Sequence, residues 1–127
     1  MATQVAHPQV ASRMAQACND FLSGLDADQR TKATYAYLDG ERVFWYYAPL
    51  NRHGLPLRDM DEPQRELALA IVASGLADGA YEQARQIIDL ETHLGELERE
   101  EGNESWVRDP ELYYFTVFGE PGGEEPW

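Results

Sequence analysis

Apolar residues recur at intervals of three and four positions in three long segments of the chain. This spacing places them on one face of an α-helix that buries that face. The segment from Val10 to Leu25 shows the pattern first, and the segment from Tyr81 to Leu97 shows it last. A short break at 76–79 before the last segment predicts an antiparallel pair of helices. The three main helices are therefore predicted over 8–23, 62–75 and 80–101.

The order Asp-x-x-Gln-Arg occurs twice, at 26–30 and at 61–65. In each copy the Asp can occupy the N-cap and accept a hydrogen bond from the backbone amide of the Gln. The Gln side chain can in turn accept from the amide of the Asp, which completes a capping box at the start of a helix. We interpret the repeat as one capping device used twice; a repeated ligand-binding element is the alternative.

The densest group of aromatic residues lies at 33–49, where six of them occur in seventeen positions. Asp39-Gly40 near the middle of this stretch is a dipeptide favoured in the type I′ turn of a β-hairpin. The stretch therefore predicts a hairpin over 33–38 and 41–47. In that hairpin Arg42 would lie across from Tyr37 and form a cation–π contact.

A further strand is predicted over 112–118, because β-branched and aromatic residues fill it. Its apolar residues show little alternation, which indicates that both of its faces are covered. The glycines and prolines of 119–127 predict a connector. Together the elements predict an α+β fold. We expect residues 1–127 to form the single N-terminal portion of a larger α+β domain, incomplete by itself.

Composition narrows the classes of function. The chain has 10 basic and 23 acidic residues, a net charge of −13, which argues against nucleic acid and anionic membranes as partners. The single cysteine, Cys18, excludes an intramolecular disulfide and lies on an apolar helix face, where a buried, inert thiol is expected. The sequence shows neither a secretory signal nor a long apolar run, so we expect a soluble, cytoplasmic chain.

No motif identifies a catalytic residue. The histidines are far apart in sequence and neither Glu-x-x-His nor His-Glu-x-x-His occurs, so no metal site is predicted within this chain. In the loop at 50–59, His53 could act as a general base and Arg52 could hold a carboxylate or phosphate; exposed turn residues are the alternative. Arg108 either positions the strand entrance through an ion pair or lines a pocket. The predicted binding residues are Arg42, Trp45, Arg52, His53 and Arg108.

Spaced motifs cover nearly the whole chain from about Phe21. They are Gln29-Arg30, Arg42-x-x-Trp45, Arg52-x-Gly54-Leu55-x-Leu57-x-Asp59-Met60, Gln64-Arg65, Leu90-Glu91-x-x-Leu94 and Arg108-Asp109-Pro110-x-x-Tyr113-x-Phe115-x-x-Phe118-Gly119-x-Pro121, with Trp127 last. Together they resemble an uncharacterised bacterial family, domain of unknown function 3500. The resemblance implies the N-terminal part only, because members continue after the position of Trp127 with a Glu-Gly-His-His-type segment.

The resemblance implies an architecture but no agreed activity. One hypothesis is an enzyme subregion, in which this chain supplies scaffold and lines a pocket with Arg42, Arg52 or Arg108. A metal-dependent hydrolytic or redox activity would then reside in the full-length protein, with the absent histidines as metal ligands. The alternative is a non-catalytic binding or assembly module that uses an aromatic strand surface. Its partner would be the missing C-terminal half or a partner chain covering the strands; the small-molecule ligand is unknown.

Overall fold

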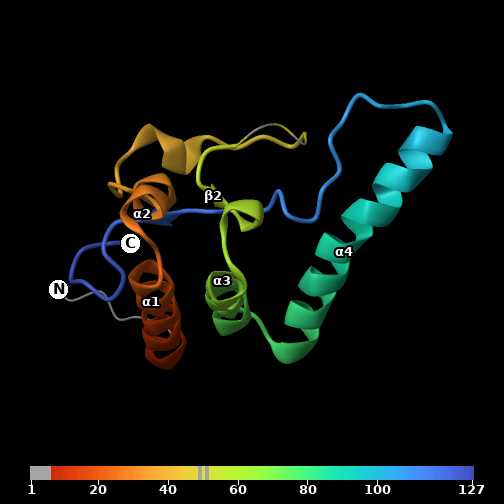
Figure 1. Cartoon of the computed structure of the whole chain (residues 1–127). Helices are drawn as coiled ribbons and strands as arrows, with labels where there is room; N and C mark the ends of the chain where they lie inside the picture. Colours follow the sequence, from red (N-terminus) through yellow and green to blue (C-terminus); the bar gives the residue numbers. More distant parts are fainter. Residues whose placement is uncertain (1–6, 49, 51) are drawn as a thin grey trace.

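The computed structural model describes residues 7–48, 50 and 52–127 (Figure 1). These residues form an α+β fold, as the sequence predicts, with two short 3₁₀ turns, η1 and η2. The elements in chain order are α1 (Pro8–Ser23), α2 (Ala27–Ala33), β1 (Thr34–Tyr35), η1 (Gly40–Val43), β2 (Leu55–Pro56), η2 (Leu57–Asp59), α3 (Glu62–Gly75), α4 (Asp78–Glu100), β3 (Tyr114–Phe115) and β4 (Val117–Phe118).

Helix boundaries follow the sequence closely. The predictions over 8–23 and 62–75 match α1 and α3, and α4 begins two residues before its predicted start. The two predicted capping boxes are also confirmed. Asp26 accepts from the amide of Gln29 at 2.8 Å, and Asp61 accepts from the amide of Gln64 at 2.9 Å, while each glutamine side chain accepts from its aspartate's amide. Local side-chain chemistry therefore sets where α2 and α3 begin.

The two capping glutamines also bind each other. The side-chain nitrogen of Gln29 donates to the side-chain oxygen of Gln64 at 2.9 Å, and the reverse bond is 2.8 Å long. Gln29 donates its second hydrogen to the carbonyl of Asp59, and Gln64 donates to the carbonyl of Gly24. Each amide thus has two donated and two accepted bonds, its full capacity. This glutamine pair links the start of α2 to the start of α3.

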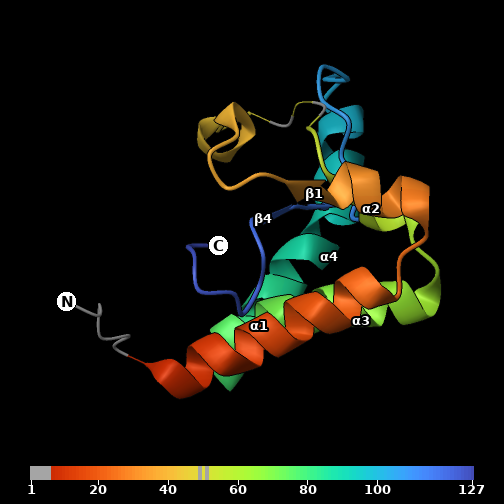
Figure 2. The ribbon, with the colours of Figure 1, turned by 90° about the vertical axis from the view of Figure 1, so that its left-hand side faces the viewer.

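Helices α1 and α3 lie side by side and pack against the short strands (Figure 2). Phe21 of α1 and Leu55 of β2 are fully buried, and the ring of Phe21 lies 6.1 Å from that of Phe115. The core therefore sits between the helix pair and the β2–β3 ladder. Its buried members are Phe21, Ala33, Leu55, Leu57, Met60 and Ala68.

The predicted hairpin over 33–38 and 41–47 is wrong. β1 pairs in parallel with β4, about 80 residues away in sequence, and η1 occupies part of the expected second strand. A type I′ turn needs a positive φ at both central residues. Asp39 instead has φ −59°, and its carboxylate accepts from the amide of Glu41 at 2.9 Å. The aspartate therefore caps a helical turn at Gly40–Val43 rather than reversing a strand.

The predicted strand over 112–118 is present as two short strands, β3 and β4, on either side of Thr116. β3 pairs antiparallel with β2, with Phe115 opposite Leu55, whereas β4 pairs with β1, with Val117 opposite Thr34. One stretch of chain thus joins the two small ladders. Its side chains are buried or half-buried, in keeping with its apolar composition.

Helix α4 leaves the end of α3 at a steep angle and extends away from the rest of the chain (Figure 1). The antiparallel helical pair predicted from the break at 76–79 is therefore wrong. The reason is that α1 already covers α3, while α4 packs its inner face on the segment around Arg108. None of the helices formed by the described residues combines the length and the hydropathy of a membrane-spanning segment.

We expect Gly54→Ala to lower the free energy of unfolding by at least about 2 kcal/mol. Gly54 has φ +109°, and an added Cβ would lie 2.5 Å from the Thr116 hydroxyl oxygen. The control is Gly40→Ala, which has open space and no positive φ, and should change stability by less than about 0.5 kcal/mol. Urea unfolding followed by circular dichroism measures both. A large loss of stability in Gly40→Ala would instead support the hairpin turn that the sequence predicts at Asp39-Gly40.

We expect Gln29→Ala to lower the free energy of unfolding by about 1–3 kcal/mol, because it leaves the half-buried amide of Gln64 without its partner. The double variant Gln29→Ala/Gln64→Ala should lose less unfolding free energy than the sum of the losses in the two single variants, because both single changes remove the same hydrogen-bonded pair. Gln16→Ala is the control, since Gln16 bonds Asp20 on the exposed surface of α1. Strict additivity in urea unfolding would contradict the coupling.

Candidate functional site

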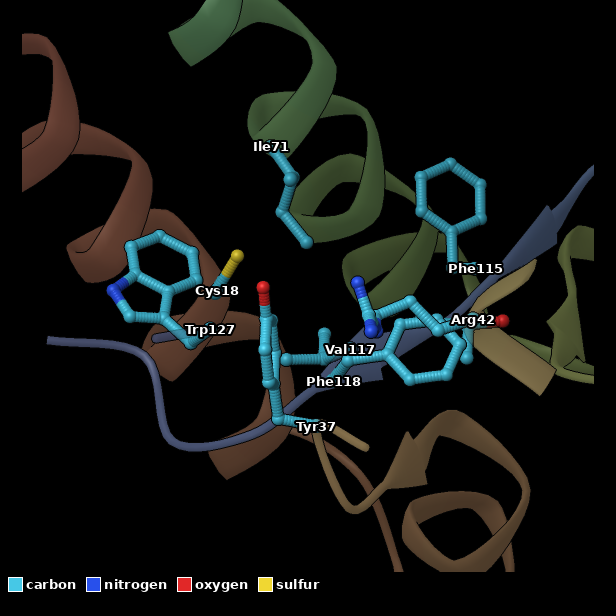
Figure 3. A pocket seen from close by; sticks show the side chains of 9 residues that line it. Cys18, Tyr37, Arg42, Ile71, Phe115, Val117, Phe118 and Trp127 are labelled. Carbon is cyan, nitrogen blue, oxygen red and sulfur yellow. The ribbon is translucent and has the colours of Figure 1, made fainter. Parts of the chain in front are cut away.

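A pocket of about 370 Å³ opens between α1, α3 and β4 (Figure 3). We call it the apolar pocket, because aliphatic and aromatic side chains form most of its wall. The residues lining it are Cys18, Tyr37, Arg42, Ile71, Phe115, Thr116, Val117, Phe118 and Trp127. Three of them carry a hydroxyl group or a charge at the side chain, namely Tyr37, Arg42 and Thr116.

The pocket wall is assembled from distant parts of the chain. α1 supplies Cys18 and α3 supplies Ile71, while β3 and β4 supply the aromatic side. Trp127 reaches the pocket because the segment 119–127 folds back onto α1, where Asn19 donates to the carbonyl of Pro121 at 3.1 Å. Gly119 permits this turn: its φ is +79°, and an added Cβ would lie 2.9 Å from the Pro126 carbonyl oxygen.

Tyr37 and Arg42 form the polar side of the pocket. The guanidinium carbon of Arg42 lies 4.4 Å from the centre of the Tyr37 ring, so the predicted cation–π contact is present although the hairpin is not. The Tyr37 hydroxyl points toward the space between Cys18 and Ile71, and the Arg42 guanidinium lies beside the Tyr37 ring (Figure 3). Among the residues that the structure describes, no carboxylate lies within 4.0 Å of this guanidinium. Arg42 is exposed, so its charge lies on the solvent-facing side of the pocket without an anionic partner within 4.0 Å from the described chain.

The thiol of Cys18 belongs to the apolar wall. The residue is buried, as the sequence predicts, and burial raises the pKa of the thiol. A raised pKa keeps the sulfur protonated at neutral pH, and a protonated thiol is a poor nucleophile. Cys18 therefore contributes shape and hydrophobicity to the pocket.

A second, wider cleft of about 630 Å³ brings together Arg52 and Arg108, two of the predicted binding residues. Arg52 donates to the carbonyls of Tyr46 and Ala48 at 2.9 and 3.0 Å. Arg108 donates to the Glu98 carboxylate, at 2.9 Å through its terminal nitrogen. Both guanidinium groups are thus used to hold their own chain in place.

The Arg108 ion pair dominates the electrostatics of this cleft. Its hydrogen bond to Glu98 is the main cause of a lowered pKa at that carboxyl and of a raised pKa at Arg108. The pKa of the Tyr113 hydroxyl is raised, mainly by burial and further by the charge of Glu91. The neighbouring Asp109 pairs with Arg58. Arg108 and Asp109 therefore form ion pairs just before β3 and also line the cleft, so the structure does not choose between the two sequence interpretations.

The other two predicted binding residues lie outside both cavities. Trp45 is 79% exposed and lines neither the apolar pocket nor the wider cleft. His53 places its Nδ1 2.9 Å from a carboxylate oxygen of Glu41, and its ring stacks on Phe44. His53 thus ties the loop before β2 to η1. The structure thus divides the five predicted binding residues into three groups. Arg42 lies in the apolar pocket, Arg52 and Arg108 lie in the wider cleft, and Trp45 and His53 lie outside both.

The described residues do not fit the metal that the resemblance implies. Within the described ranges, no three histidine, cysteine, aspartate or glutamate side chains gather as metal ligands do. His93 lies 3.9 Å from Glu96 on the exposed face of α4, and His53 has one carboxylate neighbour. The apolar pocket holds a single thiol. What the described groups can do chemically is bind an apolar body and a negative charge.

Sequence reasoning missed most of the apolar pocket. It identified Arg42 and its contact with Tyr37, but gave no signal that Ile71 or Trp127 would join them in one site. These residues meet only because β4 pairs with β1 and because 119–127 folds back. The Gly and Pro content of 119–127 indicated turns, but it did not indicate what the turns would contact.

We expect Arg108→Met to raise the pKa of the Glu98 carboxyl toward its ordinary value, because the hydrogen bond from Arg108 is what lowers it. A carboxyl with a lowered folded-state pKa stabilises the fold above its unfolded pKa and loses this contribution as the pH falls through the folded value. Wild-type stability should therefore fall more steeply than that of the variant below about pH 4.5, the ordinary value. An NMR titration of the Glu98 side chain measures the shift, with exposed Arg99→Met as control. An unchanged pKa in Arg108→Met contradicts the assignment.

Comparison with known proteins identifies the family. The model of the family described as "Protein of unknown function (DUF3500)" matches residues 7–127, nearly the whole chain. The comparisons with curated proteins and with solved structures gave no match. The match confirms the resemblance drawn from the spaced motifs. The chain belongs to the family of domain of unknown function 3500.

Proposed function

We propose that this chain binds a small, mainly apolar ligand carrying one anionic group, and that it does so as the ligand-binding part of an enzyme of its family. The observation that carries the proposal is the guanidinium of Arg42 at an aromatic pocket wall, with no carboxylate of the described chain beside it. Arginine binds carboxylate and phosphate groups through charge-assisted hydrogen bonds. The ligand's anion would lie against Arg42 and its apolar body against Ile71 and Phe118.

The size and lining of the pocket support a small-molecule ligand. Its volume of about 370 Å³ lies in the range of small-molecule sites, about 300–1,000 Å³. Such sites combine an apolar wall with a few polar groups that fix orientation. Tyr37 and Thr116 are suited to that role, since each hydroxyl can donate or accept a hydrogen bond.

The enzyme part of the proposal rests on the family resemblance. That resemblance implies a histidine-bearing segment after the position of Trp127, and Trp127 lies in the pocket wall. A metal-dependent hydrolytic or redox reaction would therefore take its ligands from outside the described residues. The alternative, an assembly module with an aromatic strand surface, has less support because 41–47 forms no strand. We also propose a cytoplasmic location, a compartment in which the thiol of Cys18 would stay reduced.

The test compares two probes of equal shape, 2-naphthoate and its neutral analogue 2-naphthamide. We expect both to shift the methyl NMR signals of Ile71 and Val117, with naphthoate binding more tightly. Arg42→Gln should weaken naphthoate binding about ten-fold, since it removes one charge-assisted contact, and leave naphthamide unchanged. Arg99→Gln, an exposed arginine on α4, is the matched control.

A second variant tests the apolar wall of the pocket separately from the charge of Arg42. Ile71→Trp fills the apolar wall and should weaken both probes, because the added ring occupies pocket volume. Equal naphthoate affinity in wild type and Arg42→Gln would contradict the role of the guanidinium. Absence of binding by either probe, or no effect of Ile71→Trp, would contradict the pocket as a ligand site.

A further inference from the structure

Helix α4 carries an apolar stripe that the rest of the described chain leaves uncovered. The stripe consists of Ile87, Leu90, Leu94 and Leu97, at intervals of three, four and three residues. Their exposed fractions are 59, 56, 38 and 45%. These intervals are those of the a and d positions of a coiled coil, which insert into the holes of a facing helix. Four large apolar residues in one exposed row are typical of an interaction surface.

The face of α4 next to the stripe is already occupied. Glu91 and Glu98 face Arg108, with nitrogen–oxygen distances of 3.9 and 2.9 Å. Gly95 lies between them, and a Cβ added there would be 3.0 Å from the Cβ of Arg108. The body of the chain therefore holds α4 along one edge of the stripe. The stripe itself and its other edge remain open to a partner.

The open edge of the stripe is acidic. At 3.6 residues per turn, Glu82, Asp89 and Glu100 lie along the edge away from Arg108, with Glu96 one row further round. All four are exposed. In the described part of the chain no lysine or arginine forms an ion pair with them, and Glu96 has only His93 at 3.9 Å. The pKa of Arg85 on the same helix is raised mainly by its hydrogen bond to Tyr81 and further by the nearby charges of Asp89 and Glu82, and Asp89 also lines a hollow shared with Arg65 of α3. A partner that covers the stripe therefore meets chiefly the negative charge of Glu96 and Glu100.

We propose that the α4 stripe docks an amphipathic helix with apolar residues at heptad spacing and with lysine or arginine beside them. The apolar residues would interlock with Ile87, Leu90, Leu94 and Leu97, and the basic residues would pair with the open acidic edge. A second copy of this chain, at net charge −13, offers no such complement. Anionic lipid headgroups would be repelled by the same carboxylates. This proposal is independent of the apolar pocket.

The test uses two synthetic helical peptides of three heptads with identical leucine positions. One carries lysine beside the leucines and the other carries glutamate. Calorimetry with the full 127-residue chain should show binding of the lysine peptide, at least about ten-fold tighter than the glutamate peptide, and weaker at 500 mM salt than at 50 mM. The double variant Leu90→Ser/Leu94→Ser should weaken the lysine peptide at least ten-fold. These residues are exposed, and circular dichroism checks that the variant stays folded.

The matched control is Val43→Ser on η1, an exposed apolar residue away from α4, which should bind the lysine peptide as wild type does. An equal loss in Val43→Ser would reveal nonspecific adhesion and overturn the proposal. No binding of the lysine peptide, or equal binding of both peptides, would overturn it too. So would sedimentation that shows a wild-type dimer which Leu90→Ser/Leu94→Ser dissociates, because the stripe would then be covered by a second copy.

Discussion

The backbone pairing of one segment, residues 111–119, holds the rest of the structure together. On one side the amides of Leu57 and Arg58 donate to the carbonyls of Tyr113 and Glu111, both at 3.0 Å. On the other side the amide of Gly119 donates to the carbonyl of Tyr35, also at 3.0 Å. β1 and β2 have only two residues each and cannot form a ladder alone. Their position, and that of the helices that follow them, depends on this segment.

The same segment creates the site. Its apolar side chains pack under α1 and α3, and its far end carries the chain back toward α1, so that Trp127 closes the pocket. The parallel pairing of β1 with β4 then brings Tyr37 and Arg42 over the opening. Two residues close together in the chain, Tyr37 and Arg42, thus meet a wall made by α1, α3 and the C-terminal segment. The site is a product of topology rather than of any local motif.

This origin explains what the sequence could and could not predict. The starts of α2 and α3 were predictable because their caps are local: Asp26 and Asp61 bond residues three positions away. The partner of β1 was not, because Asp39-Gly40 suits both a hairpin turn and the capped 3₁₀ turn that it forms, and only the distant β4 decides between them. Arg42 was identified from its residue type and its neighbour Tyr37. The rest of its pocket had no local signal.

The mutual amide bonds between Gln29 and Gln64 have a consequence for how the chain opens. Each glutamine caps its own helix and also forms two hydrogen bonds with the side-chain amide of the other glutamine. When the first turn of one helix frays, the glutamine of the other helix is therefore left with an unpaired donor and an unpaired acceptor. We therefore expect the capped amides of Gln29 and Gln64 to lose protection from hydrogen exchange together, as a single cooperative unit. Two helices separated by almost thirty residues of chain behave, at their starting ends, as one.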